Sequence, residues 1–407
     1  MYTICMLQVG WKEKESKVME NLLLITNAKV VSDGALRDDC GILIDGEGRI
    51  SDVFDMQDLD TAKHHAKELF DAEGRIVSPG LVDTHIHGIG GFGTDAAEPS
   101  SILGMSQRLI DFGVTGFLPT LYAGRPSKMA KEADCIVQAI GHEEGAAILG
   151  VNMEGPFLSP KKAGAQDPES LTLPNAKVFE ELCDASKGRL VCMTISPELK
   201  GVEEIADIAA KKGIVLLAGH TNATYDEALH GIECGIHHAT HMFNAMSPLN
   251  HKQPGVAGAA LMDDRMNCEV IADGVHVHKD LVKFTADKKP NGNVVLITDS
   301  LTPTALGEGT FTANGTKVVL GERGAFVDAS NPDLLCGSAL TLNKGVGNVV
   351  SWGVPVEKAL AMATCNPARI YGFKDIGSIK KGHLGNIAVF DDDFNAVAVF
   401  VNGEQRA

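Results

Sequence analysis

The chain has 407 residues, of which 44% are hydrophobic and 22% are charged, and its formal net charge is −17. This composition is typical of a soluble globular protein with room for one large domain and a smaller companion. The negative charge argues against broad binding to nucleic acid or to an anionic membrane, but it leaves room for a small anionic substrate in a local positive pocket.

The cysteines and the first residues indicate where the protein works. Nine cysteines are spread along the chain without any CxxC pair, a pattern that indicates reduced thiols rather than a disulfide framework. No apolar run has the length of a membrane span. The opening MYTICMLQVGWKEKESKV lacks the basic start and the cleavage site of a secretory signal. We therefore expect a cytoplasmic protein.

The two ends of the chain are predicted to form strands. Residues 1–18 precede the first strand-like run, MENLLLITNAKVV, and we interpret them as an extension, either an upstream start or a disordered appendage. Short apolar runs and Asp-Gly or Glu-Gly turn signals follow as far as residue 77, and the C-terminal segment GSIKKGHLGNIAVFDDDFNAVAVFVNGEQ has the same character. We predict that residues 19–77 and 378–407 pack together as one small β-sandwich domain.

Between these segments, apolar runs alternate with helical stretches, as in βα units that build a parallel sheet. The runs cover residues 81–88, 114–120, 146–155, 189–198, 213–220, 237–245, 267–276 and 293–300. These eight repeats predict an α/β fold in which residues 78–377 form a catalytic (β/α)8 TIM-type barrel.

The first of these runs, PGLVDTHIHG, carries His85 and His87 two residues apart. On a strand, such residues point to the same face, about 6.5–7 Å apart, and their imidazoles could converge on one cation. The spacing alone is weak support, because the number of such pairs expected by chance in a chain with this many histidines is about one half. His276-Val277-His278 repeats the pattern.

Polar residues end most of the other runs. They are Glu154, His220, His241, Asp273, His276 and Asp299. In a (β/α)8 barrel, the C-terminal ends of the strands form the active site. A single buried histidine is more often structural, but five histidines and several carboxylates at one barrel mouth indicate a centre for zinc, iron or manganese.

With these residues, the chain resembles the amidohydrolase superfamily, and within it the N-acetylglucosamine-6-phosphate deacetylases. The resemblance covers nearly the whole chain after Met19. It implies a metal-dependent hydrolase that converts N-acetyl-D-glucosamine 6-phosphate to D-glucosamine 6-phosphate and acetate, in amino-sugar catabolism. The motifs that carry it are PGLVDTHIHG, NMEGPFLSPKKAGAQDPE, GHTNATYDEA, HATHMFNAMSPL, PGVAGAA, IADGVHVH, LITDS and ATCNPARIYG.

The resemblance also implies a ligand set for one or two divalent metals. Glu154, His220 and His241 match the ligands of the principal metal. His85 and His87 match those of a second metal, with Glu154 as the bridge. Some relatives lack the second histidine of the pair and use one metal, whereas this chain has both.

Two further residues match the catalytic groups of the family. Asp299 corresponds to the carboxylate that is a metal ligand and that acts as base toward water and then as acid toward the departing amine. From the residues alone, Asp299 could instead be a strand-end aspartate that caps the next helix. His276 corresponds to the group that steadies the substrate and the carbonyl oxygen.

The expected phosphate site differs from that of the family. Asn244 and Ala245 match the backbone donors to phosphate. The family commonly has an arginine before E-P-G, but this chain reads Asn250-His251-Lys252-Gln253-Pro254-Gly255. Lys252 offers a point charge instead of a bidentate fork, and His251 is either a second contact or a solvated loop residue.

Two residues near the expected sugar site leave the hexosamine open. Gln166 stands where some relatives have histidine, and Leu335 begins a segment, LCGS, that resembles a family loop near the sugar. A deacetylase of N-acetylgalactosamine 6-phosphate is therefore one alternative. A cyclic amidase of the same superfamily is another, but it usually carries a metal-bridging lysine on strand four, and RLVCMTISPE has none. The resemblance further implies a homodimer.

Overall fold

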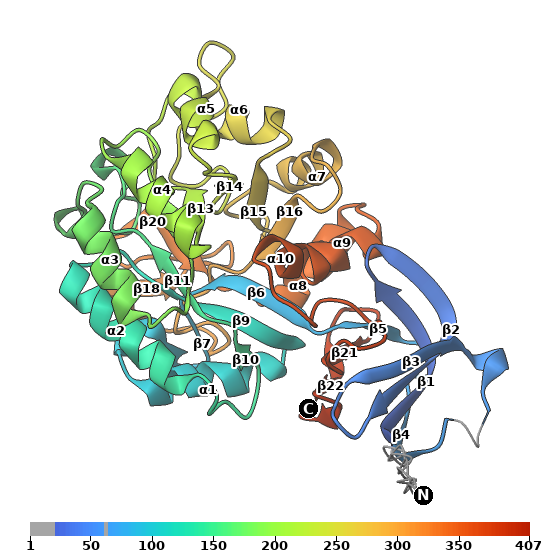
Figure 1. Ribbon diagram of the computed structural model, residues 1–407. Coiled ribbons are helices and arrows are strands. Elements are labelled where there is room, and N and C mark those ends of the chain that lie inside the picture. The colour runs from blue at the N-terminus through green and yellow to red at the C-terminus, as the bar shows by residue number, and fades with distance from the viewer. Residues whose placement is uncertain (1–20, 61–63) are drawn as a thin grey trace, which may run out of the picture.

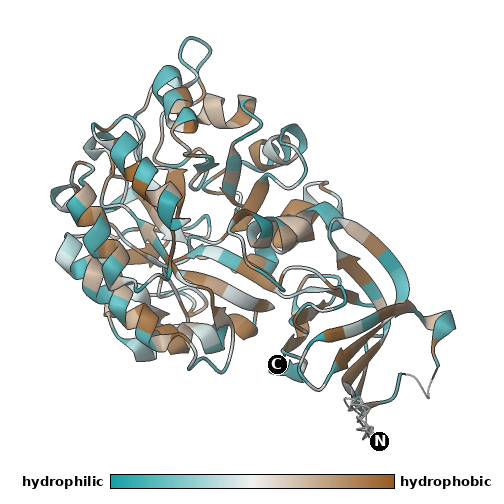
Figure 2. Cartoon of the chain, in the orientation of Figure 1, coloured by the Kyte–Doolittle hydropathy of each residue, from teal (hydrophilic) through white to brown (hydrophobic). Residues whose placement is uncertain are grey.

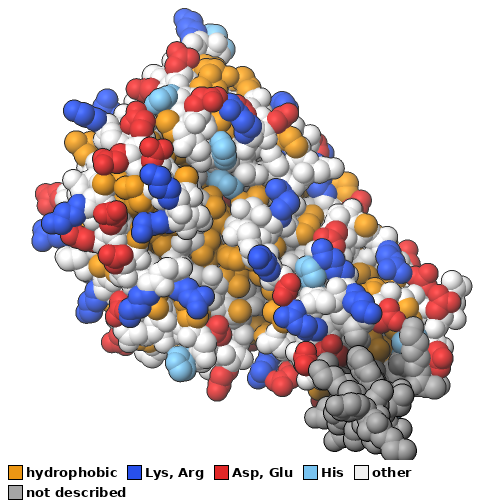
Figure 3. Space-filling view, in the orientation of Figure 1, with side chains coloured by type: hydrophobic (Ala, Val, Ile, Leu, Met, Phe, Trp, Pro, Cys, Tyr) orange, Lys and Arg blue, Asp and Glu red, His pale blue; other side chains and the backbone are white. Residues whose placement is uncertain are grey.

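The computed structural model describes residues 21–60 and 64–407 and contains a barrel with a smaller β domain at one side (Figure 1). The predicted extension, residues 1–18, lies outside the described residues. Among the described residues, no helix is both long and apolar enough to cross a membrane. Acidic and basic side chains are interspersed over the face of the molecule shown in Figure 3.

The barrel consists of parallel strands that are hydrogen-bonded in chain order. They are β6 (Leu81–Ile86), β9 (Val114–Leu121), β11 (Val151–Glu154), β12 (Leu190–Ile195), β13 (Val215–Ala218), β14 (His238–Ala239), β15 (Asn267–Ile271) and β16 (Val294–Ile297), with the short β10 (Ala147–Ile148) also paired to β9. Just past β16, the amide of Asp299 donates to the carbonyl of His85 at 2.8 Å. This bond joins the last strand to the first, and each predicted run contains one of the eight strands, so the predicted barrel is confirmed.

Helices surround these strands (Figure 1). They are α1 (Pro99–Ile110), α2 (Pro126–Ala139), α3 (Ala176–Ala185), α4 (Val202–Lys212), α5 (Tyr225–Glu233), α6 (Gly255–Met262), α7 (Lys279–Lys288), α8 (Leu342–Ser351), α9 (Val356–Met362) and α10 (Cys365–Ile370). On α1, the buried residues Ile102, Met105 and Leu109 recur at helical spacing, so one face packs on the barrel. Figure 2 shows hydrophilic and hydrophobic residues together on α2, α3 and α4 as well.

The small β domain is built from both ends of the described chain. Its strands are β1 (Asn21–Ser32), β2 (Ala35–Asp45), β3 (Ile50–Asp55), β4 (Ala66–Asp71), β5 (Ile76–Pro79), β21 (Ile387–Phe390), β22 (Ala396–Val401) and β23 (Glu404–Gln405). They form one sheet, in which β5 pairs antiparallel with β21.

This sheet forms two layers. The strand β1 pairs with β2 along one edge, and with β4 and then β5 along the other. Ile25 and Ile42 from one part of the sheet pack in the same buried cluster as Val389 and Phe400 from the other. The predicted sandwich of N- and C-terminal segments is confirmed, while the boundaries 19–77, 78–377 and 378–407 stay a prediction.

A four-stranded antiparallel sheet between β16 and α8 was not predicted from the sequence. It consists of β17 (Thr310–Ala313), β18 (Thr316–Leu320), β19 (Ala325–Asp328) and β20 (Asn331–Ser338). The last strand returns to the barrel, where the amide of Ser338 donates to the carbonyl of Asp299 at 2.9 Å. A two-stranded ribbon, β7 (Gly88–Ile89) and β8 (Phe92–Gly93), follows β6. Both insertions therefore lie at the C-terminal end of the barrel strands.

Candidate active site

The six predicted metal ligands lie together at the C-terminal mouth of the barrel. They are His85 on β6, His87 just after it, Glu154 at the end of β11, His220 after β13, His241 after β14 and Asp299 after β16. They form two groups, in each of which the candidate ligand atoms lie within 4.8 Å of one another.

The first group consists of Glu154, His220 and His241. Atom Oε1 of Glu154 lies 2.8 Å from Nε2 of His220 and 2.9 Å from Nε2 of His241, and these two nitrogens are 3.2 Å apart. All three side chains are buried. One carboxylate oxygen and two imidazole nitrogens thus converge on a single point.

The second group consists of His85, His87 and Asp299. Atom Oδ1 of Asp299 lies 3.3 Å from Nε2 of His87 and 3.6 Å from Nε2 of His85. The other oxygen of Glu154, Oε2, is 3.5 Å from Nε2 of His87. Glu154 therefore stands between the two groups, with one oxygen toward each, as a bridging ligand would.

Hydrogen bonds on the outer side of these imidazoles determine which nitrogen faces the centre. The Nδ1 atoms of His87 and His220 lie 2.9 Å from the carbonyl of Thr120 and 3.0 Å from the carbonyl of Lys162. A carbonyl only accepts, so each Nδ1 carries a proton, and each Nε2 is the nitrogen that faces the group and would bind a cation there. Outer partners of this kind are usual for metal-binding histidines. The donor set of imidazoles and carboxylates therefore fits zinc, iron or manganese.

The charges of the site are interdependent. Burial alone would raise the pKa of Glu154, but the neighbouring imidazoles outweigh burial and lower it well below its usual range. The pKa of Asp299 is likewise lowered, against burial, chiefly by its hydrogen bond with His87. Burial opposes the imidazolium form of His85, but its hydrogen bond to Glu269 and the carboxylates around it raise its pKa to about 10. A cation that binds here must displace protons, so its affinity will depend on pH.

A pocket of about 260 Å³ opens above the two groups. The predicted residues Gln166, Asn244, Ala245, His276 and Leu335 all line it. Gln166 Nε2 donates to Glu154 Oε2 at 2.5 Å, so Gln166 orients the carboxylate of Glu154. His276 is held by Asp273, whose Oδ2 lies 2.6 Å from the Nδ1 of His276.

Two predicted substrate contacts lie elsewhere. His251 and Lys252 are exposed on the loop before α6, and neither lines the pocket. This loop projects at the top of Figure 1. In the single chain, the expected phosphate site therefore contains Asn244 and Ala245 without the side chains of His251 and Lys252.

The structure also brings in residues that the sequence analysis did not select. Tyr122 lines the pocket and stacks on His87, with ring centroids 3.9 Å apart. Glu269 lies in the middle of β15, and its Oε2 is 3.3 Å from Nδ1 of His85. Glu269 stands inside its apolar run and not at its end, where the selected residues lie. Tyr122 directly follows β9 but is not one of the metal-ligand residue types that were sought.

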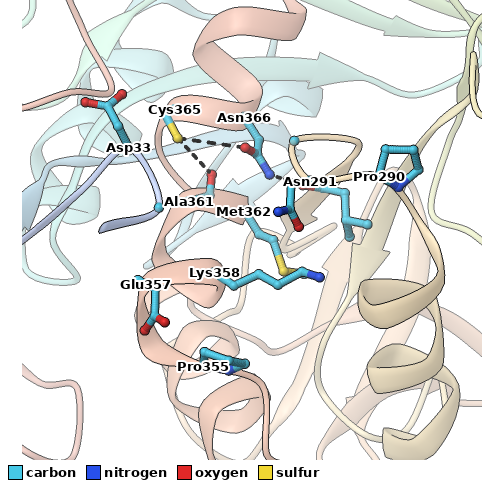
Figure 4. Close-up of a pocket in the computed structure, with 13 residues that line it drawn as sticks. Asp33, Pro290, Asn291, Pro355, Glu357, Lys358, Ala361, Met362, Cys365 and Asn366 are labelled. Atoms are coloured by element: carbon cyan, nitrogen blue, oxygen red, sulfur yellow. Dashed lines mark hydrogen bonds between the residues drawn. The ribbon is translucent and has the colours of Figure 1, made fainter. Parts of the chain in front are cut away.

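A second cavity, of about 410 Å³, lies at the opposite end of the barrel (Figure 4). Its walls come from residues 290–294 before and at the start of β16, from α9 and α10, and from Asp33 on the turn between β1 and β2. Among the described residues, both groups with metal-ligand geometry lie at the other end of the barrel. The candidate chemistry therefore belongs to the smaller pocket.

A family model described as "Amidohydrolase family" matches residues 76–406. The chain belongs to the amidohydrolase family. This amidohydrolase is 32% identical over 406 residues to the N-acetylglucosamine-6-phosphate deacetylase of Rattus norvegicus, covering 96% of this chain and 97% of that protein. It is 30% identical over 405 residues to the enzyme of the same name from Bacillus subtilis, with 96% of each chain covered.

Solved structures show the same relationship. The N-acetyl-D-glucosamine-6-phosphate deacetylase of Mycobacterium smegmatis, determined as a mutant in complex with N-acetyl-D-glucosamine-6-phosphate, has a TM-score of 0.88 and 27% identity to this chain. The match covers 95% of this amidohydrolase and 100% of that chain. The resemblance drawn from the sequence motifs, to the deacetylases of the amidohydrolase family, is confirmed.

Proposed function

We infer that this amidohydrolase hydrolyses N-acetyl-D-glucosamine 6-phosphate to D-glucosamine 6-phosphate and acetate. The observation that carries the inference is the position of Glu154 between two groups of metal-ligand side chains, beside Asp299, in a pocket open to solvent. Its relatives with this activity in their names align with nearly the whole chain.

A divalent cation bound by Glu154, His220 and His241 would supply a polarising charge and an activated water molecule near neutral pH. Asp299 faces the same space and is the proposed base and acid. Its carboxylate accepts a proton from water as the new C–O bond forms, and it delivers that proton to the nitrogen as the C–N bond breaks. Acetate and a free amine result.

His276 and Gln166 are proposed to position the reacting groups. Asp273 holds Nδ1 of His276, so the ring keeps one orientation and Nε2 is free to contact the carbonyl oxygen. Gln166 holds Oε2 of Glu154, which leaves Oε1 for the principal metal. We propose zinc, iron or manganese, with one ion at the Glu154 group and a second at the His85 group.

Asn244, Ala245 and Leu335 are proposed to bind the sugar phosphate. In the single chain the pocket receives no cation from His251 or Lys252, because these residues lie on a projecting loop. We propose that the protein is a homodimer in which this loop reaches the phosphate site of the partner. The eight described cysteines are free thiols, which supports the proposed cytoplasmic location.

Acetate release from purified protein tests the function. The metal-loaded protein is incubated with the 6-phosphates of N-acetylglucosamine and N-acetylgalactosamine, and with unphosphorylated N-acetylglucosamine. We expect the highest kcat/KM for the first substrate. A higher kcat/KM for N-acetylgalactosamine 6-phosphate would make that sugar the substrate. No acetate from either sugar phosphate would refute the deacetylase assignment.

A further inference from the structure

The histidines of the two metal-ligand groups differ in what holds their outer nitrogen. His87 and His220 face backbone carbonyls, as described above. The Nδ1 atom of His85 instead lies 3.3 Å from Oε2 of Glu269. Among these histidines, and within residues 21–60 and 64–407, His85 is the one whose outer nitrogen faces a carboxylate.

Glu269 is buried and is held from its other side. It lies on β15, it is 1% exposed, and its Oε1 accepts a hydrogen bond of 2.6 Å from the hydroxyl of Tyr371. The hydroxyl of Tyr371 thus donates to one carboxylate oxygen of Glu269, and the other oxygen faces Nδ1 of His85. Tyr371 follows α10, and its ring is 8% exposed and stacks near His238 and Phe373.

The inner nitrogen of His85 completes the chain of contacts. Its Nε2 is buried and has no hydrogen-bond partner in the part of the chain that the structure describes. It lies 3.6 Å from Oδ1 of Asp299, within the second metal-ligand group. With Nδ1 facing Glu269, Nε2 is the ring nitrogen directed at that group. A buried nitrogen without a partner at this place is what a metal ligand requires.

We propose that Glu269, supported by Tyr371, orients and polarises His85 as a ligand of the second metal, so that occupancy of the His85 group depends on a carboxylate that never touches the metal. A hydrogen bond to an anion is stronger than one to a carbonyl, and it increases the basicity of the opposite ring nitrogen. Glu269 and Tyr371 are positioning residues, because they act through His85.

Glu269→Gln tests the proposal, since glutamine keeps the size and can still accept from His85 through its amide oxygen, while its amide nitrogen faces Tyr371 and the charge is lost. Metal-stripped protein is titrated with Zn²⁺ in competition with a chromogenic chelator, which resolves tight and weak sites. We expect affinity at the His85 group to fall about 10- to 100-fold, with the Glu154 group unchanged. Glu132→Gln is the matched control, because Glu132 is another buried glutamate (4% exposed), on α2. This control should leave both affinities as in the wild type.

Two further variants keep the test decisive. Tyr371→Phe should weaken the same site only a few-fold and is informative even if Glu269→Gln folds poorly. In a His85→Asn background, Glu269→Gln should have no further effect on Zn²⁺ binding, because its route to the metal is gone. An effect that persists in that background, an equal loss at both sites, or no loss at either would overturn the proposal. A wild-type protein that binds Zn²⁺ at one site alone would do the same.

The inference rests on the proposed function only through its two-metal site, and the measurements separate the two. If the wild type releases no acetate while the Zn²⁺ titration responds to Glu269, the function is wrong and the role of Glu269 stands. If acetate is released while the titration ignores Glu269, the role of Glu269 is wrong and the function stands.

Discussion

Three site residues have backbone angles that side-chain-bearing residues adopt rarely. The φ angles of His220, His241 and Asp299 are 46°, 28° and 51°. Such conformations cost of order 1–3 kcal/mol each and persist where surrounding contacts hold them. At Asp299 the amide donates to His85 and the carbonyl accepts from Ser338. The turn directs each side chain back over the end of its strand, toward the metal-ligand groups.

Asp299→Asn exploits this geometry, because asparagine tolerates positive φ better than most residues. The backbone should therefore be preserved while proton transfer is lost. We expect kcat to fall about 10²- to 10⁴-fold, with the metal of the Glu154 group retained. Steady-state kinetics and metal analysis on the same sample measure both. Asp264→Asn, on the surface, is the control, and a kcat within twofold of wild type for Asp299→Asn would refute the role.

At the scale of single elements, α2 carries a buried glutamate, Glu132. Glu132 is 4% exposed, and burial raises its pKa to about 7, against partial compensation from Lys128, whose Nζ lies 3.5 Å away. An acid with a raised folded-state pKa binds more protons in the folded than in the unfolded chain. Stability should therefore decrease as pH rises from about 4.5 to 7, and the penalty should be complete above that window.

Glu132→Gln should remove this penalty. The variant is expected to match the wild type in free energy of unfolding near pH 4.5 and to exceed it at pH 8 by at most a few kcal/mol, because one pKa unit corresponds to about 1.4 kcal/mol. Denaturant unfolding of metal-loaded protein at both pH values measures the difference. An equal gain at both pH values would mean that packing, not ionisation, is responsible.

The β17–β20 sheet contributes part of the pocket wall through residues 333–337 of β20. Leu335, on β20, lines the pocket and is partly exposed. Leu335→Ala should raise KM roughly three- to tenfold through lost apolar contact with the sugar, with little change in kcat, since Leu335 is far from proton transfer. Initial-rate kinetics over a range of substrate concentrations separate the two constants. Leu306→Ala, at an exposed leucine outside the pocket lining, should change neither.

The elements differ in how well the sequence predicts them. The barrel strands were predictable because they are buried on both faces and read as continuous apolar runs. The β17–β20 sheet was not, because its short strands are half exposed and carry no such run. The strand-end ligands were found by position and motif. Glu269 and Tyr371 were missed because they are 102 residues apart and meet only in the folded chain.

At the scale of the whole molecule, the proposed homodimer would place Lys252 of one chain at the phosphate site of its partner. Lys252 lies on the projecting loop, so Lys252→Ala should raise KM for the sugar phosphate at least tenfold without changing the metal content. In a homodimer with exchanged loops, a mixture of Lys252→Ala and Asp299→Asn subunits should regain activity, because some pairs combine an intact Asp299 with an intact partner loop. Light scattering should give about twice the 43.1 kDa chain mass. A stable monomer, or no recovery on mixing after subunit exchange, would contradict the loop exchange.

The pairing of β5 with β21 has a consequence for synthesis of the protein. Pro79 is opposite Ile387 in that ladder, and about 300 residues lie between them. At roughly 5–20 residues per second on the ribosome, β5 waits about 15–60 s for its partner strand. During that time, the apolar face of β1, β2 and β5 lacks the cover of β21 and β22. The barrel must emerge and fold while the first strands of the chain are still incomplete, so the nascent chain should depend on chaperones at its beginning and be released from them at its end.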